Sequence, residues 1–119
     1  MKRIIKERAR NIRIAFNGAR KLLQTEISIQ IEFGIAVLVT LAGLYIGLSP
    51  TEWILQTLAI GLVMGMEGMN TAVEKTADFI HPGHHPHIGF IKDISAGAVF
   101  ITAVAAVVTG GIIYFPKLF

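Results

Sequence analysis

Three apolar runs of roughly 20 residues each constrain what this chain can fold into. They are Ile27–Leu48, Trp53–Val73 and Ile94–Phe115, and each contains at most one charged side chain. As an α-helix, such a run is long enough to cross the hydrocarbon core of a bilayer. Of the 119 residues, 53% are hydrophobic, which is high for a soluble domain of this size. The sequence therefore predicts an all-α integral membrane protein with three transmembrane helices in one domain, residues 1–119.

The first 25 residues carry most of the positive charge. Eight of the eleven Lys and Arg residues lie in the first 21 positions, shortly before the first apolar run. Ile5, Ile12, Phe16 and Leu23 fall on one face of a helix, which predicts an amphipathic helix lying in the membrane interface. A solvated basic arm is the alternative, and the apolar face argues against it. Positive charge beside a membrane span is typical of contact with anionic lipid, so nucleic acid is not an expected partner.

The same charge distribution predicts the topology. The basic N-terminal side is expected in the cytoplasm, and the turn Ser49–Glu52, which lacks Lys and Arg, is expected outside. The second run then returns inward to a cytoplasmic connection over residues 75–93. Its helix is expected to continue to about Ile80, before Pro82 and Gly83 break it. The third run carries the C-terminus outside.

A polar stripe marks the inner end of the second run. A helix turns about 100° per residue, so the stripe comprises Glu67, Asn70, Thr71, Glu74 and Asp78. A membrane segment rarely carries a carboxylate that has no function. The stripe is therefore the first candidate for a functional site.

Topology brings three more charged residues to the same interface. Glu26 precedes the first run, and Lys92 and Asp93 precede the third. Carboxylates and carboxamides suit Mg²⁺ that is shared with phosphates, and lysine suits a phosphate charge. A partly buried carboxylate can also act as a general base. This set favours phosphoryl transfer from a cytoplasmic nucleotide to a membrane lipid alcohol.

Soluble kinase and thiol chemistry do not fit the sequence. Neither a GxxxxGK[ST] loop nor a GxGxxG motif is present. The chain has no cysteine, which excludes disulfides and thiolate catalysis.

Other interpretations of the charged residues remain open at this point. An ion pair between Glu67 and Lys92 that only holds helices together is one alternative, and Glu26 and Asp93 are also suited to helix N-termini. A proton-coupled multidrug transporter has a similar size, but it needs its carboxylate near the bilayer midplane. A holin-like pore would not need the acid–amide stripe.

Four histidines crowd the connection between the second and third runs. They are His81, His84, His85 and His87. A transition-metal site is one interpretation. The other is a polar loop near a polyphosphate, which the sequence favours because no pair of histidines has a fixed spacing on a helix.

Two motifs carry a resemblance to a known family. The pattern ExxNTAxE appears as Glu67–Glu74, and the pattern KDxxAGAV appears as Lys92–Val99. In these motifs, in the order of its elements and in the upstream Glu26, the chain resembles the small prokaryotic integral-membrane lipid kinases. This is the bacterial diacylglycerol kinase and undecaprenol kinase family, and the resemblance covers essentially the whole chain.

The resemblance implies roles for individual residues. Glu67 would be the catalytic base, and Asn70 would position the reacting groups. Glu26 and Glu74 would hold the Mg²⁺ of the ATP. Nucleotide contacts are implied for Glu26, Glu74, Gly83, His84, His85, Lys92 and Asp93.

The resemblance also implies an assembly, a location and a substrate. Members are homotrimers with active sites shared between subunits, which implies a homotrimer in the bacterial inner membrane with a cytoplasmic active site. The AGAV sequence after Lys92 and Asp93 looks more like the undecaprenol kinase branch, since the diacylglycerol kinase branch often has GSAA there. Undecaprenol is therefore slightly favoured over diacylglycerol as the lipid.

Overall fold

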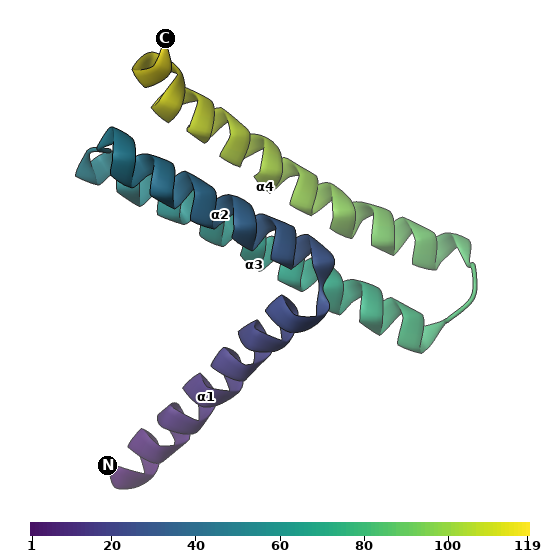
Figure 1. Ribbon diagram of the computed structural model, residues 1–119. Helices are drawn as coiled ribbons and strands as arrows, with labels where there is room; N and C mark the ends of the chain where they lie inside the picture. Colours follow the sequence, from purple (N-terminus) through teal and green to yellow (C-terminus); the bar gives the residue numbers. More distant parts are fainter.

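The computed structural model describes residues 1–119 as four α-helices (Figure 1). They are α1 (Lys2–Thr25), α2 (Ile27–Ile46), α3 (Pro50–Ile80) and α4 (Pro86–Leu118). α2 and α4 both pack on α3, and the contact between α3 and α4 is the more extensive. α1 projects away from this three-helix bundle (Figure 1). The prediction of an all-α protein is confirmed.

α1 forms where the sequence predicts an amphipathic helix, and none of its residues is buried. Ile5, Ile12 and Phe16 are all more than half exposed. The helix touches the bundle at its C-terminal end, where a Cβ atom added to Gly68 on α3 would lie 2.9 Å from Cδ1 of Leu22. The amphipathic face is therefore free to meet a membrane surface, which stays a prediction.

The turn between α2 and α3 is shorter than predicted. α2 ends at Ile46, and the φ of its cap residue Gly47 is 86°, in the left-handed region that glycine adopts without strain. The Ser49 hydroxyl accepts from the Glu52 amide, and the Glu52 carboxylate accepts from the Ser49 amide. This capping box, with Pro50 at the first helical position, starts α3. The predicted turn Ser49–Glu52 is therefore wrong for its last three residues, which belong to α3.

The Glu52 carboxylate is further stabilised by a cation. Lys117 near the end of α4 places its Nζ 3.0 Å from Oε2 of Glu52. The hydrogen bond from the Ser49 amide, together with Lys117, holds the pKa of Glu52 below its usual value. This pair links the start of α3 to the end of α4.

The connection between α3 and α4 contains only residues 81–85. α3 ends at Ile80, as predicted, and His81 has an extended backbone. α4 begins at Pro86, where Nδ1 of His85 accepts a 3.1 Å hydrogen bond from the His87 amide. We call the end of the bundle that carries residues 81–85 the loop end.

The early start of α4 changes the surroundings of two predicted site residues. Lys92 and Asp93 were expected in the connection, just before a helix starting at Ile94. They are instead the seventh and eighth residues of α4. A proline at the first helical position and a histidine cap start this helix before its sequence becomes apolar. The helix of the third run thus starts at Pro86 and not at Ile94, while the span 94–115 and the cytoplasmic connection before it stay predictions.

At the opposite end, polar side chains join the three bundle helices. The Tyr114 hydroxyl on α4 lies 2.5 Å from Oε1 of Gln56 on α3 and 2.9 Å from the Val39 carbonyl oxygen on α2. Nε2 of Gln56 also donates to this carbonyl, at 3.3 Å. Such hydrogen bonds hold helices together in an apolar environment.

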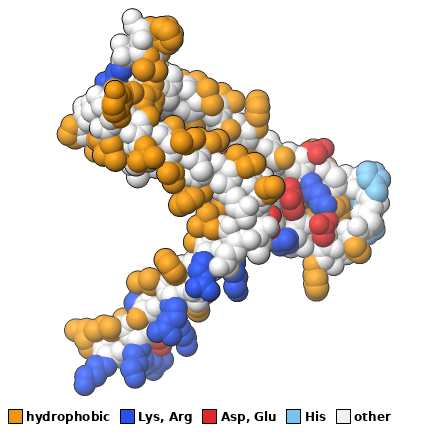
Figure 2. Space-filling model, viewed as in Figure 1, with side chains coloured by type: hydrophobic (Ala, Val, Ile, Leu, Met, Phe, Trp, Pro, Cys, Tyr) orange, Lys and Arg blue, Asp and Glu red, His pale blue; other side chains and the backbone are white.

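The surface of the bundle is apolar. Only eight of the 119 residues are buried, and most large hydrophobic side chains are exposed (Figure 2). α2 and α4 are long and apolar enough to cross a bilayer. α3 falls outside this group because Gln56, Glu67 and Asn70 interrupt its apolar sequence. Two of the three predicted spans thus lie in helices that are long and apolar enough to cross a bilayer, and the span in α3 stays a prediction.

Candidate active site

The charged side chains of the bundle gather toward the loop end. In Figure 2, acidic side chains and lysines lie together there, next to the histidines of the loop. They come from the C-terminal half of α3, from the start of α4 and from Glu26 between α1 and α2. The topology inferred from the sequence predicted this gathering.

Asn70 is the buried member of the α3 stripe. It is 8% exposed, and its Nδ2 donates a 3.1 Å hydrogen bond to Oε1 of Glu74, one turn further along α3. Its Oδ1 is buried and has no hydrogen-bond partner. A buried acceptor without a partner is costly, so this oxygen suits a donor or a cation supplied by a ligand.

Glu26 occupies the single residue between α1 and α2. Its backbone is extended, and its carboxylate turns toward α3. Nζ of Lys75 lies 3.4 Å from Oε1 of Glu26, and the Thr25 hydroxyl lies 3.5 Å from the same oxygen. The polar pattern of the sequence predicts no role for Lys75, which is marked there only by its position directly after Glu74.

A second ion pair crosses from α4 to α3. Nζ of Lys92 lies 2.5 Å from Oδ1 of Asp78. The alternative in which Lys92 pairs with Glu67 is therefore wrong for this structure, because Lys92 pairs with Asp78. Asp93 is exposed on α4 and takes part in no ion pair.

Glu67 lies on α3 and Glu32 on α2, close enough for their charges to interact. Oε2 of Glu32 is buried without a hydrogen-bond partner. In the sequence, Glu32 is the single charged residue of the first apolar run, Ile27–Leu48. Its nearness to Glu67 depends on how α2 lies against α3, which the sequence pattern does not give.

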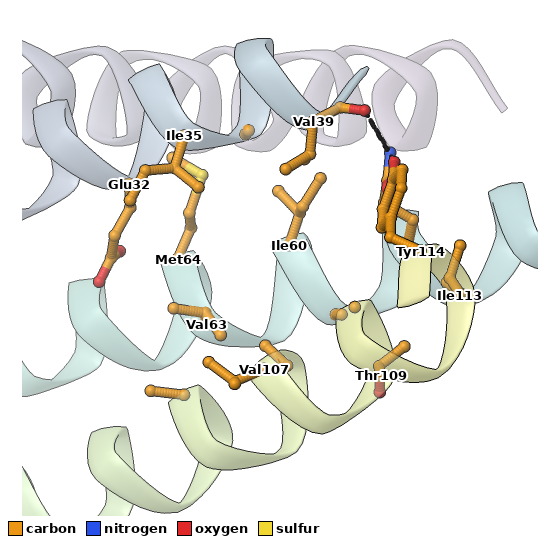
Figure 3. A pocket seen from close by; sticks show the side chains of 16 residues that line it. Glu32, Ile35, Val39, Ile60, Val63, Met64, Val107, Thr109, Ile113 and Tyr114 are labelled. Carbon is orange, nitrogen blue, oxygen red and sulfur yellow. Dashed lines mark hydrogen bonds between the residues drawn. The ribbon is translucent and has the colours of Figure 1, made fainter. Parts of the chain in front are cut away.

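A cavity of about 410 Å³ lies between α2, α3 and α4 (Figure 3). Glu32 stands at one end of it and Tyr114 at the other, where Tyr114 is hydrogen-bonded to Gln56. The side chains between these ends are mostly apolar and include Val63 and Val107. The cavity is therefore suited to a hydrocarbon chain whose polar end lies beside a carboxylate.

The four histidines form the loop and the start of α4. Nδ1 of His81 lies 3.0 Å from the Gly83 carbonyl oxygen, and the His85 ring lies 5.1 Å from the His81 ring and 5.4 Å from the His87 ring. His84 and Gly83 are exposed beside them. No group of three or more His, Asp or Glu side chains is placed to hold a metal ion. The histidine metal site is thus not supported.

The oxygen atoms at the loop end can be compared with the ligands that Mg²⁺ prefers. Mg²⁺ usually takes one or two protein carboxylates and completes its shell with water and substrate phosphates. Glu74 and the unpaired Oδ1 of Asn70 belong to one side-chain pair on α3, and Glu26 reaches the same helix at Lys75, so these oxygens are the candidates for such an ion. They do not form a closed cage for a resident ion.

Comparison with known proteins identifies the family. Residues 13–114 match the family model described as prokaryotic diacylglycerol kinase. The undecaprenol kinase of Bacillus subtilis (strain 168) is 38% identical over 87% of this chain and 85% of its own length. The diacylglycerol kinase of Synechocystis sp. is 31% identical over 91% of this chain and 62% of its own length. That of Haemophilus influenzae is 29% identical over 85% of this chain and 86% of its own length. The chain belongs to the prokaryotic diacylglycerol kinase family and is a membrane lipid kinase.

Proposed function

We propose that this lipid kinase transfers the γ-phosphate of ATP to the hydroxyl of a membrane lipid alcohol and requires Mg²⁺. One observation carries the proposal: the apolar cavity is lined by Glu32 and Met64, and Glu67 of the charged stripe follows Met64 by three residues on α3, a little less than one helical turn. A lipid chain in the cavity would bring its hydroxyl toward Glu67. A nucleotide at the loop end would approach the same carboxylate from the other side.

Glu67 is the proposed general base. Its carboxylate accepts the proton of the lipid hydroxyl while that oxygen attacks the γ-phosphorus. The bond from this phosphorus to the bridging oxygen breaks, and ADP leaves with the electron pair. Asn70 positions the reacting groups through its free Oδ1, and its Nδ2 holds Glu74 in place.

Glu26 and Glu74 are the proposed ligands of the Mg²⁺ that accompanies ATP. The bound ion supplies positive charge that neutralises the phosphates as charge develops in the transition state. Further nucleotide contacts are proposed at the loop end for Gly83, His84, His85, Lys92 and Asp93. For Lys92 this requires release from Asp78, and both side chains are partly exposed.

We further propose that the whole chain forms one membrane domain with transmembrane segments 27–48, 53–73 and 94–115. The basic α1 and the active site would face the cytoplasm of a bacterial inner membrane, with the C-terminus outside. The proposed assembly is a homotrimer with shared active sites. The large exposed apolar surface of the single chain supports further contacts with lipid or with other copies.

Undecaprenol is the proposed lipid, slightly favoured over diacylglycerol. The AGAV sequence after Lys92 and Asp93 supports it. So does the relative named undecaprenol kinase, whose 38% identity exceeds the 31% and 29% of the two relatives named diacylglycerol kinase. The alternative is a diacylglycerol kinase that makes phosphatidic acid.

Phosphate transfer in a defined membrane tests this function. The protein is purified into lipid nanodiscs and supplied with labelled ATP and either undecaprenol or diacylglycerol, with and without Mg²⁺. We expect labelled lipid only with Mg²⁺ and a higher kcat/KM for undecaprenol. Failure to label either lipid would refute the kinase mechanism proposed here, and a higher kcat/KM for diacylglycerol would reverse the choice of lipid.

Filling the cavity tests whether it holds the lipid chain. Ala106 on α4 lines the cavity, whereas its neighbour Ala105 is exposed and does not. We expect Ala106→Phe to raise the KM for the lipid about tenfold, the effect of losing about two buried methylene groups. The KM for ATP should stay unchanged. If Ala105→Phe has the same effect, or if Ala106→Phe leaves the lipid KM unchanged, the chain binds elsewhere.

A further inference from the structure

Lys75 makes an ion pair with a carboxylate that is a proposed metal ligand. Its Nζ lies 3.4 Å from Oε1 of Glu26. The side chain of Glu26 is 25% exposed and that of Lys75 is 71% exposed. The other three ion pairs of the chain involve neither Glu26 nor Glu74. In the protein without nucleotide, Lys75 is thus the cation that neutralises Glu26.

The Glu26 carboxylate binds the Lys75 ammonium group less well when it also binds a divalent cation. An ion bound to Oε1 of Glu26 would lie within a few ångströms of Nζ of Lys75, and like charges at such distances repel. Lysine carries its charge on a flexible four-carbon stem. Because most of this side chain is already exposed, Lys75 can leave Glu26 without disturbing the packing of α3.

The position of Lys75 on α3 determines which group its ammonium contacts once it is released from Glu26. It follows Glu74 directly on α3, so a phosphate chain whose metal binds Glu26 and Glu74 lies within reach of its side chain. Lysine binds phosphate oxygens as a point charge. We propose that Lys75 exchanges partners, holding Glu26 in the free enzyme and contacting the nucleotide phosphates in the loaded enzyme.

The exchange rests on the proposed function and deepens it, because it assigns a phosphate-binding residue to the same site. It also has a distinctive signature. Removing the charge of Lys75 frees Glu26 for a metal ion, so the affinity for the metal alone rises. The same change removes a phosphate contact, so the affinity for the metal–nucleotide complex falls. A residue that only holds α3 to Glu26 would not move the two affinities in opposite directions.

Lys75→Gln tests the exchange by two measurements in nanodiscs. Mn²⁺ binding without nucleotide is followed by electron paramagnetic resonance, and the KM for MgATP is measured by lipid phosphorylation. We expect the dissociation constant for Mn²⁺ to fall about fivefold and the KM for MgATP to rise about fivefold, as for a partly exposed charge contact of about 1 kcal/mol. Lys75→Arg, which keeps the charge, should restore the KM.

Lys117→Gln is the matched control. It also removes a lysine from an ion pair, at 3.0 Å from Glu52, but at the opposite end of the bundle. Neither constant should change in this variant, and circular dichroism checks that all variants keep the helix content of the unmodified protein.

The outcomes separate the two proposals. If the unmodified protein does not phosphorylate lipid, the proposed function fails. If it phosphorylates lipid but binds no Mn²⁺ without nucleotide, the partner exchange is overturned and the proposed function stands. The same holds if Lys75→Gln shows any pattern other than the two opposite shifts, or if Lys117→Gln reproduces that pattern.

Discussion

We expect Glu67→Gln to lower kcat for lipid phosphorylation about 10³-fold, within the range that general-base catalysis contributes. The amide has nearly the shape of the carboxylate but cannot accept the proton of the lipid hydroxyl. Glu67 is only partly buried and makes no ion pair. The helix therefore has no structural reason to rearrange. Initial rates of phosphate transfer in nanodiscs at saturating ATP and lipid measure the effect.

Glu32→Gln is the comparison that makes this result specific. Glu32 interacts with Glu67 across the α2–α3 contact and lines the cavity, so the same chemical change is made a short distance from the proposed base. We expect a much smaller loss of kcat. A loss of about 10³-fold in Glu32→Gln with a normal rate in Glu67→Gln would transfer the role of base to Glu32.

The metal ligands give the second large effect. In Glu26→Gln and in Glu74→Gln, we expect the Mg²⁺ concentration that gives half-maximal activity to rise about 10- to 100-fold, because each change removes a charged ligand. Activity should recover at high Mg²⁺, since neither carboxylate takes the proton. Glu74→Gln also keeps an acceptor for Nδ2 of Asn70, so the local geometry of α3 should survive.

Mg²⁺ titrations of phosphate transfer check this prediction, and Glu52→Gln is its control. Glu52 lies at the opposite end of the bundle, where it caps α3 and pairs with Lys117. Its substitution should leave the Mg²⁺ titration unchanged. Titrations of Glu26→Gln and Glu74→Gln that coincide with that of the unmodified protein would remove both residues from the metal site.

The sequence predicted which segments are helical, because apolar residues recur along them with the period of a helix. It predicted the first residues of α3 and α4 less accurately. α1, α2 and the end of α3 at Ile80 agree with the sequence analysis. The start of α4 does not, because the hydropathy of a run shows where a helix becomes apolar and not where it begins. Pro86 and the His85 cap carry the earlier start, and both are local signals that the apolar run hides.

The composition of the loop-end site was predictable, but its pairing was not. Topology alone brings Glu26, Lys92 and the α3 stripe together, since these positions are fixed by the order of the helices. Which cation meets which carboxylate depends on the rotation and offset of the helices. The sequence does not give these quantities, so the contacts of Lys75 with Glu26 and of Lys92 with Asp78 emerge only from the structure.

The unbroken course of α3 from Pro50 to Ile80 has a consequence for how water is kept from the reaction. Soluble kinases close a mobile loop or lobe over their substrates, and this exclusion of water prevents wasteful hydrolysis of ATP. A rigid helix that carries both the proposed base and the phosphate-binding residues cannot close in this way. If the site works as proposed, the hydrocarbon around Glu67 takes the place of the lid, and the lipid alcohol reaches the γ-phosphate from a phase that water does not occupy.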